Sequence, residues 1–260
     1  MLSVNEFRRD GYCLLPDVYN PSLLSKLRSL IDMDLDEWAK IMAVRGRSKE
    51  SGVVAHHALT KQHWIDFIEL LEPYNFYSQL LNSAPVVSAF GVLDNCKADP
   101  IYLHANHIDQ RFQLSTSETI MLNILIFVDE FTVETGATWL YPGSHRDLKH
   151  VEYESAIQVV GSAGSVLVWD SRLLHRAGEN LNGQHRRAIS LMLTRPWLKP
   201  QFDYSDFVIR NSMQPTSDKV SQLLGLNCQV PKTLDDWYPI DGRRMYLPQQ
   251  DDWISDATSL

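Results

Sequence analysis

TIMLNILIFV, at residues 119–128, is the stretch of sequence that decides the predicted fold. Its aliphatic residues recur at every second position, and a β-strand places alternate residues on one face. The stretch therefore predicts a strand with one apolar face. That face consists of Ile120, Leu122, Ile124, Ile126 and Val128.

Further short apolar runs lie on both sides of this strand, and turn residues bound them. Gly136, Pro142, Gly143 and Gly164 are the clearest of these turn residues. The runs predict strands at residues 101–109, 137–141, 165–169, 173–178 and 187–194. A series of six or more short strands after a helical segment predicts a double-sheet jelly roll.

The rest of the chain is predicted to be mainly helical. A short helix begins at Phe7 and breaks at Gly11, and a strand follows at residues 12–15. Pro21 opens a longer helix that carries leucines at helical spacing. Further helices are predicted at residues 63–71, 77–81 and 217–224. We predict one domain over residues 1–260, with a helical part at about 1–85, a β-barrel core at about 86–197 and a C-terminal extension at 198–260.

Composition and charge exclude several classes of protein. The 260 residues are 44% hydrophobic, which is enough for a sizeable core. The net charge of -8 disfavours binding to nucleic-acid phosphates. The three cysteines, Cys13, Cys96 and Cys228, lie far apart and form no CxxC pair, so neither a zinc ribbon nor a disulfide framework is predicted. A reducing cytoplasm is the expected compartment.

The chain shows no predicted secretory or membrane segment. The first residues, MLSVNEFRRD, become charged at once and contain no apolar h-region. The longest apolar stretch, near residues 124–128, is far too short to span a bilayer. We therefore expect neither a membrane partner nor a nucleic-acid partner. The expected partner is a small-molecule substrate, and the oligomeric state stays open.

His107 and Asp109, with the distant His175, are the residues of greatest chemical interest. Residues i and i+2 of a strand point to the same face, so His107 and Asp109 would present an imidazole and a carboxylate side by side. Two histidines and one carboxylate form the facial ligand set of non-haem Fe(II) oxygenases, which leaves metal positions open for a co-substrate and O2. An HxD pair alone is weak evidence for such a site.

Arg186 completes the pattern through a predicted hairpin. Asn-Gly at residues 182–183 lies between two strand-like runs, which is a strong signal for a two-residue turn. Counting back from that turn pairs His175 with Ser190 and places Arg186 on the same face as His175, with Arg187 facing the other way. The spacing would let 2-oxoglutarate bind the metal with one end and Arg186 with the other. A β-bulge in the hairpin would exchange the roles of Arg186 and Arg187.

The chain resembles the phytanoyl-CoA dioxygenase-like (PhyH) family of Fe(II)/2-oxoglutarate-dependent oxygenases over roughly residues 7–197. The motifs that carry the resemblance are FRRDGYCLLP at residues 7–16, VDEFT at 128–132, GAT at 136–138, PGSH at 142–145, GSVLV at 164–168, HRAGEN at 175–180 and RRAIS at 186–190. The resemblance implies a double-stranded β-helix core, jelly-roll and cupin-like, with the N-terminal helices packed outside.

The same resemblance implies site residues. Fe(II) would bind His107, Asp109 and His175, and the distal carboxylate of 2-oxoglutarate would bind Arg186. In the family, the residue three positions before the first ligand often lies near the co-substrate, and here that residue is His104. His104 and Asn106 form a rival pair for the metal, although an asparagine is a poorer iron ligand than an aspartate. We interpret residues 142–145 as a structural turn rather than a metal site.

The predicted activity is that of a dioxygenase that hydroxylates an unactivated C–H bond of a small molecule, using Fe(II), 2-oxoglutarate and O2 and releasing succinate and CO2. Asp109 favours hydroxylation over halogenation, because family members that halogenate carry a small residue at this position. Desaturation, cyclisation or epimerisation with the same cofactors is an alternative. Two further alternatives are a cupin-like metalloenzyme and a non-catalytic binding protein, neither of which would use 2-oxoglutarate.

Overall fold

The computed structural model of the protein describes residues 4–46, 54–96, 102–110, 116–149, 151 and 153–238. The chain divides into two compact units. Unit 1 comprises Met1–Ala58 and Phe90–Met192, and unit 2 comprises Leu59–Ala89 and Leu193–Leu260. The predicted boundaries near residues 85 and 197 fall close to two of the points where the chain passes between these units. The single domain over 1–260 stays a prediction.

Unit 1 holds most of the strands and the two N-terminal helices. Its elements are α1 (Val4–Asp10), β1 (Tyr12–Leu15), α2 (Pro21–Val44), β2 (Val54–Ala55), most of β3 (Val86–Asp94), the 3-10 turns η3 (Tyr102–His104) and η4 (Tyr153–Ser155), β4 (Met121–Phe127), β5 (Thr138–Leu140), β6 (Ile157–Val159), β7 (Val166–Asp170), β8 (His175–Arg176) and most of β9 (Arg187–Thr194). Helix α2 begins as predicted, with Pro21 in its first turn and the Asn20 side chain accepting a hydrogen bond from Leu23 N at 3.0 Å.

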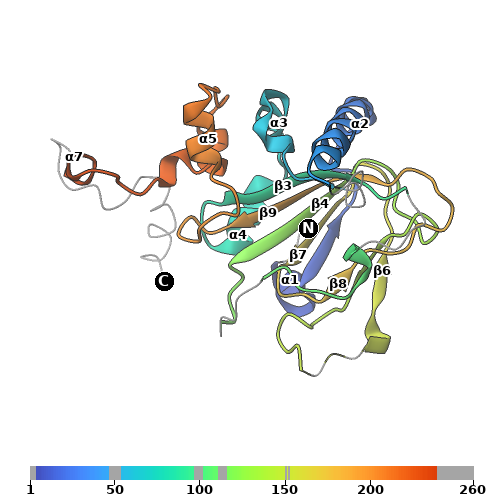
Figure 1. Ribbon diagram of the computed structural model, residues 1–260. Helices are drawn as coiled ribbons and strands as arrows, with labels where there is room; N and C mark the ends of the chain where they lie inside the picture. Colours follow the sequence, from blue (N-terminus) through green and yellow to red (C-terminus); the bar gives the residue numbers. More distant parts are fainter. Residues whose placement is uncertain are drawn as a thin grey trace. The chain divides into compact units, whose positions relative to one another are not determined.

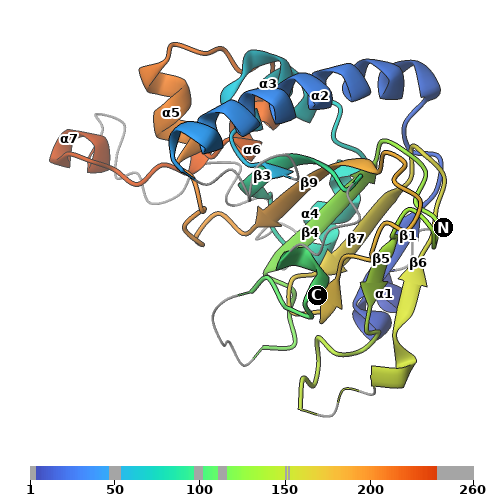
Figure 2. The same ribbon diagram turned by 45° about the vertical axis from the view of Figure 1, so that its right-hand side comes forward.

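The strands form two antiparallel sheets, as expected for a jelly roll. The six-stranded sheet has the order β1-β7-β4-β9-β3-β2, and the three-stranded sheet has the order β6-β5-β8. Figures 1 and 2 show helix α2 on one side of the large sheet and the small sheet on its other side. The predicted double-stranded β-helix fold is confirmed, with α2 packed outside it.

Strand β4 lies near the centre of the large sheet and differs from the prediction in its burial. All seven of its residues are buried, not only those on the predicted apolar face. Leu122, Ile124 and Ile126 face away from the small sheet, whereas Leu125 and Phe127 join the apolar cluster that includes Leu140 of the small sheet. Both faces are covered, so the polar residue within this strand also faces the interior.

The predicted strand at residues 101–109 is wrong. The described part of this segment begins with the 3-10 turn η3, and only one isolated bridge follows, between His107 and His175. Leu103 O accepts a hydrogen bond from Ala177 N at 2.8 Å, which holds the turn beside strand β8. Tertiary contacts with β8, rather than local strand propensity, therefore place this segment.

The predicted β8–β9 hairpin is also wrong, so His175 does not pair with Ser190. Strand β8 pairs with β5, placing Leu140 opposite His175, while β9 belongs to the other sheet. Between them the chain turns at Gly183, which has a φ of +70°. Asn180 Nδ2 donates to Asn95 O and Gln184 O, at 2.5 and 2.7 Å, and so stabilises this crossover between the sheets.

Unit 2 is mainly helical. It contains α3 (Gln62–Ile68), α4 (Tyr74–Leu81), α5 (Tyr204–Arg210), α6 (Asp218–Leu223), η5 (Leu226–Cys228) and α7 (Leu234–Trp237), and the 3-10 turn η2 (Ala58–Thr60) leads into it. Lys219 Nζ in α6 donates to Glu69 O and Leu71 O, at 2.8 and 3.0 Å, which ties α6 to the end of α3. Helices therefore form in all three predicted regions of this unit. In the described residues, no helix is both long and apolar enough to cross a membrane.

Candidate active site

His107 and His175 are brought together by backbone pairing. His107 N donates to His175 O at 2.9 Å, and His175 N donates to His107 O at 3.0 Å. The two imidazole rings lie 4.3 Å apart between centroids. Residues 68 positions apart in the sequence thus present their side chains to one point, as the ligand prediction requires.

Asp109 joins the two histidines through a separate anchor. Its backbone N–H and that of Gln110 both donate to Ser171 O at 3.0 Å. The carboxylate then lies with Oδ2 3.3 Å from His175 Nε2 and Oδ1 3.8 Å from His107 Nε2. One ligand atom from each of the three residues fits within 4.8 Å of the others, which is compact enough for a single metal ion.

The hydrogen bonds of the two imidazoles favour metal binding. His107 Nδ1 lies 2.8 Å from Ala105 O, and His175 Nδ1 lies 3.0 Å from Leu173 O. A carbonyl oxygen only accepts, so each neutral ring carries its proton on Nδ1 and directs the Nε2 lone pair at the carboxylate. Such carbonyl partners are typical of the outer shell of metal-binding histidines. The donor set therefore fits a divalent metal ion.

The pKa shifts of His107 and Asp109 also favour metal binding. Burial lowers the pKa of His107, and the nearby His175 lowers it further, so the neutral ring is favoured. Burial alone would raise the pKa of Asp109. When His175 is protonated, its Nε2–H donates to the carboxylate and its charge lies close by. Together with His107 and the hydrogen bond from Asn123, these contributions outweigh burial and leave the pKa of Asp109 below its ordinary value. An ionised carboxylate beside neutral imidazoles is the state that binds a metal cation.

Two other groups in the described residues have ligand atoms close enough for a metal, but both have other roles. In the first, Asp94 Oδ1 accepts from Arg186 N at 2.9 Å and Oδ2 accepts from His185 Nδ1 at 2.6 Å. In the second, the His57 ring stacks on Trp38 with the centroids 5.3 Å apart. The members of these groups are Asp94, Cys96 and His185, and Asp34, Glu37 and His57.

Arg186 lies just before strand β9 and is buried, with 3% of its surface exposed. Its Nη1 donates to Gly136 O, and its guanidinium lies 4.7 Å from the centre of the Phe131 ring. Nε is buried without a hydrogen-bond partner among the described residues, and no carboxylate there forms an ion pair with the side chain. Burial lowers the pKa of Arg186 to about 10, so the guanidinium remains charged at neutral pH.

A buried, charged and unpaired guanidinium is costly and is expected to have an anionic partner. Phe131 belongs to the same apolar cluster as Trp169, and the Trp169 ring lies 5.1 Å from the His175 ring. One side of this cluster thus contacts Arg186 and another contacts a metal-ligand candidate. The structure brings Arg186 to the same interior as the histidines, although the hairpin count that selected it was wrong.

Arg187 does not exchange roles with Arg186. Its Nε lies 2.7 Å from Asp32 Oδ1, and its Nη1 lies 3.0 Å from Asp129 Oδ2. Asp32 belongs to α2, so Arg187 faces the helix that covers the outside of the sheet. The alternative that placed Arg187 in the site is therefore not realised.

His104 experiences the charge of Arg186, and its predicted place near the co-substrate stays a prediction. Burial lowers its pKa; the charge of Glu179 opposes this effect, while the charges of Arg186 and Arg176 add to it. His104 is outside the group of three candidate ligands. Its rival partner Asn106 is exposed, and its Oδ1 accepts a hydrogen bond from Tyr141 OH at 3.1 Å.

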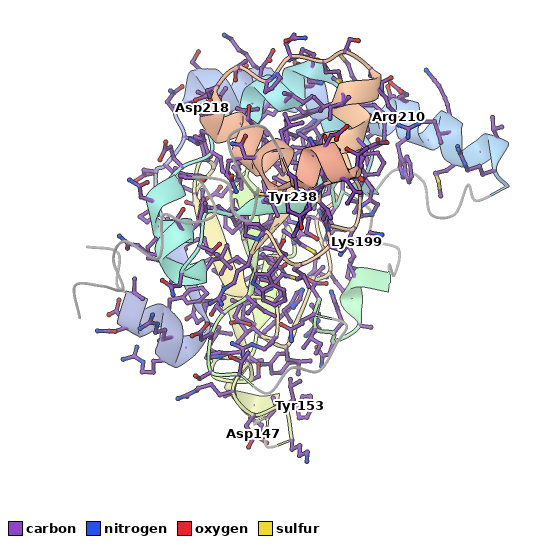
Figure 3. All side chains as sticks on the ribbon, turned by 90° about the vertical axis from the view of Figure 1, so that its left-hand side faces the viewer. Asp147, Tyr153, Lys199, Arg210, Asp218 and Tyr238 are labelled. Carbon is purple, nitrogen blue, oxygen red and sulfur yellow. The ribbon has the colours of Figure 1, made fainter. Side chains whose placement is uncertain are left out.

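The turn at residues 142–145 has the structural role that we assigned to it. Gly143 N donates to Asp10 O at 2.9 Å, and Leu174 N donates to Ser144 Oγ at 2.9 Å. His145 Nε2 lies 3.1 Å from Arg8 O. The turn thus joins helix α1 to the strand that carries His175. The next segment leads to β6, and Figure 3 labels Asp147 and Tyr153 on it, at the lower edge of that view.

Three residues of the site were missed in the sequence. Asn123 donates a side-chain hydrogen bond to Asp109 Oδ2, Asp94 holds the backbone of Arg186, and Gly136 accepts from the Arg186 guanidinium. Asn123 had a readable signal, because it is the one polar residue within the apolar run at 120–128. Asp94 and Gly136 had no signal that distinguishes them from other acids and turn glycines.

Comparisons with known proteins place this geometry in a family. The model of the family described as phytanoyl-CoA dioxygenase (PhyH) matches residues 7–188. An uncharacterized protein of Mycobacterium tuberculosis is 30% identical over 260 residues, covering 92% of both chains. Dioxygenase trt7 of Aspergillus terreus is 21% identical over 271 residues, covering 92% of this chain and 84% of its own. The solved structure of EctD from S. alaskensis with 2-oxoglutarate and 5-hydroxyectoine has a TM-score of 0.62 at 17% identity, covering 74% of each chain.

The likeness to EctD shows the fold alone, because the identity is low. The family match is more informative, because it covers well over half of the chain and includes all the candidate site residues. The resemblance inferred from the motifs is thereby confirmed. The chain belongs to the phytanoyl-CoA dioxygenase (PhyH) family, and this membership supports oxygenase chemistry of the Fe(II)/2-oxoglutarate type as its general class of activity.

Proposed function

We propose that the protein is a non-haem Fe(II)- and 2-oxoglutarate-dependent dioxygenase that hydroxylates an unactivated C–H bond of a small molecule. The observation that carries this proposal is the buried Arg186, which has a charged guanidinium and no acidic partner among the described residues. A cupin-like metalloenzyme that does not use 2-oxoglutarate has no need for such a residue. A dicarboxylate co-substrate supplies the missing negative charge.

The chain's own residues have separate tasks in this reaction. His107, Asp109 and His175 would hold Fe(II), with both Nε2 lone pairs already set by the carbonyl oxygens behind the rings. Arg186 would bind the distal carboxylate of 2-oxoglutarate. When bound, Fe(II) and 2-oxoglutarate supply the activation of O2, with succinate and CO2 as co-products.

One residue favours hydroxylation over halogenation: Asp109 fills the position at which a small residue would leave room for a halide. Trp169 and Phe131 are 5% and 0% exposed and form an apolar border between the candidate metal ligands and Arg186. His104 is proposed to contact the co-substrate, since it already experiences the charge of Arg186.

The substrate is proposed to be a small molecule rather than a nucleic acid or a membrane. The net charge of -8 opposes phosphate-backbone binding. All three cysteines are free thiols, which suits a reducing compartment such as the cytoplasm.

The test is an anaerobic titration of the metal-free protein with Fe(II) and then 2-oxoglutarate. A weak visible metal-to-ligand charge-transfer band is expected when the keto acid chelates the metal. In Arg186→Ala the band should need at least about tenfold more 2-oxoglutarate, because a charge-assisted hydrogen bond is lost. If iron binds but no band forms, the 2-oxoglutarate proposal is wrong and a metalloenzyme with another co-substrate replaces it.

A further inference from the structure

Asn123 is an amide in the middle of the apolar strand β4, and only 3% of its surface is exposed. A buried amide is unfavourable unless both its donor and its acceptor have partners. Burial in this strand therefore requires a specific set of contacts. Those contacts lead directly to the candidate metal ligands.

The amide of Asn123 is satisfied at both ends. Nδ2 donates to Asp109 Oδ2, and Oδ1 accepts from Ser171 Oγ at 2.9 Å. Ser171 is itself fully buried and follows the end of strand β7. Three buried or partly buried groups thus form one chain of hydrogen bonds that ends on a carboxylate oxygen.

Ser171 reaches Asp109 by a second route. Its carbonyl oxygen accepts the backbone N–H of Asp109 at 3.0 Å, while Ser171 N donates to Met121 O at 3.1 Å. Strand β4, the end of strand β7 and the ligand segment are therefore linked through this one residue. The backbone position of Asp109 and the orientation of its carboxylate both depend on Ser171.

The Asp109 carboxylate determines which way the Asn123 amide faces, because an ionised carboxylate only accepts hydrogen bonds and therefore requires the NH2 group. A reversed amide would place two oxygens against each other at Asp109. The Ser171 hydroxyl, which can donate or accept, donates to Oδ1 and satisfies the other end of the amide. Asp109 Oδ1, in contrast, receives no hydrogen bond among the described residues; its close neighbour is the His107 ring, with Nε2 at 3.8 Å.

We propose that Asn123, held in place by Ser171, is a positioning residue for the metal site. It holds the Asp109 carboxylate in the orientation that places Oδ2 near His175 Nε2 and Oδ1 near His107 Nε2. This inference rests on the proposed function, because it requires a metal at His107, Asp109 and His175. Outer-shell partners of this kind commonly change metal affinity by about 10- to 100-fold.

The matched control is another buried hydroxyl that holds a carboxylate at strand β7. Thr119 Oγ1 donates to Asp170 Oδ2 at 2.8 Å, and both residues are buried. Asp170 is also paired with Arg172 at 2.8 Å and is not among the candidate metal ligands. Thr119→Val therefore removes a comparable buried hydrogen bond without touching the site.

The experiment measures Co(II) binding to four full-length proteins: wild type, Asn123→Leu, Ser171→Ala and Thr119→Val. Calorimetry gives the affinity, the Co(II) d–d absorption reports the ligand geometry, and the melting temperature of the metal-free protein reports folding. We expect about 10- to 100-fold weaker Co(II) binding and altered d–d bands in Asn123→Leu. Ser171→Ala should weaken binding about 2- to 10-fold, and Thr119→Val should bind Co(II) as the wild type does.

Each outcome separates the inference from the proposed function. If the wild type does not bind Co(II), the metal site itself is wrong. If the wild type binds and Asn123→Leu binds within about twofold of it with unchanged bands, the positioning role is wrong. If Thr119→Val loses as much Co(II) affinity as Asn123→Leu, the positioning role is also wrong, because the loss would then come from general destabilisation of the core. If Asn123→Leu does not fold, Ser171→Ala decides by the same two readouts.

Discussion

At the start of strand β9, two neighbouring arginines lie on opposite faces of the large sheet, and only one of them forms ion pairs. On the outer face, Arg187 pairs with Asp32 and Asp129. On the inner face, Arg186 has no acidic partner among the described residues, and Asp109 lies between two imidazoles. Both faces carry an arginine and an aspartate, but only the outer face pairs them.

This difference separates structural charges from functional ones. Completed ion pairs stabilise the docking of α2 and need no further partner. The inner charges lie on different sides of an apolar cluster and cannot neutralise each other, so each is complementary to something from outside. A cation suits the carboxylate end and a dicarboxylate suits the arginine end, which agrees with the proposed binding of Fe(II) and 2-oxoglutarate.

We expect the largest effect when Asp109 on the inner face and Asp129 on the outer face are each replaced by alanine. Asp109→Ala should weaken Fe(II) binding by more than about 100-fold, because loss of a ligand exceeds the usual effect of an outer-shell partner. Asp129→Ala should leave Fe(II) binding unchanged and lower the free energy of unfolding by about 1–3 kcal/mol, because Arg28 and Arg187 lose their acceptor. Iron content and urea unfolding measure the two effects. Equal loss of iron in both variants would contradict the assignment of Asp109 to metal binding and of Asp129 to structural ion pairs.

The next effect compares the two arginines, each replaced by methionine. Arg186→Met should raise the dissociation constant for 2-oxoglutarate by about 10- to 100-fold, whereas Arg187→Met should leave it unchanged. For the stability of the metal-free protein we expect the reverse: Arg187→Met should be the less stable variant. Arg187→Met loses two ion pairs, with Asp32 and Asp129, each worth about 0.2–1 kcal/mol. Arg186→Met removes a buried unpaired cation and should not destabilise the protein. Tight 2-oxoglutarate binding by Arg186→Met would contradict the assigned role.

A smaller effect tests the backbone that holds Arg186. Gly136 has a φ of +80°, and a Cβ there would lie 2.5 Å from Gly178 O. Gly143 has a φ of +81°, but its Cβ would meet only Arg146 Nη2 at 3.4 Å. Alanine at either position adopts an unfavourable left-handed backbone, at a cost of roughly 1–2 kcal/mol. Gly136→Ala must also displace backbone, so it should lose more stability in urea unfolding and bind 2-oxoglutarate more weakly.

Gly143→Ala is the matched control for this pair. It should keep the wild-type affinity for 2-oxoglutarate, since Gly143 does not contact Arg186. Similar stability and affinity in the two variants would mean that the Gly136 carbonyl does not position the guanidinium.

The smallest effect is the pH dependence of the metal-free protein. Burial lowers the pKa values of His56, His104, His107 and His145. Below the unfolded value of about 6.5 the unfolded chain binds more protons than the folded one. Stability is therefore full above about pH 6.5 and declines as the pH falls towards the folded pKa values. Urea unfolding between about pH 5.5 and 7.5 measures this slope.

His145→Gln separates a structural histidine from those of the site. The slope should become shallower in this variant, because one of the contributing groups is removed. Fe(II) binding at pH 7 should be unchanged, since His145 hydrogen-bonds Arg8 O and is not among the candidate metal ligands in the described residues. A slope that does not change would show that His145 does not contribute to the pH dependence.

The sequence by itself determined the features that depend on local pattern. The alternation at residues 119–128 determines strand β4, and Pro21 with Asn20 determines the start of helix α2. The residue types of the candidate site, with the motifs around them, also pointed to the family that the comparisons confirm.

Only the tertiary structure decided which distant segments meet. The segment at 101–109 forms no regular strand where it is described, because its backbone hydrogen bonds go to separate places: to His175 in β8, to Ala177 after β8 and to Ser171 after β7. Strand β8 in turn pairs with β5 rather than with β9. Strand periodicity is local and says which residues share a face, but not which sheet a short strand joins. That choice depends on packing across the whole interior, which is also what buries Arg186 without an acid and turns Asn123 towards Asp109.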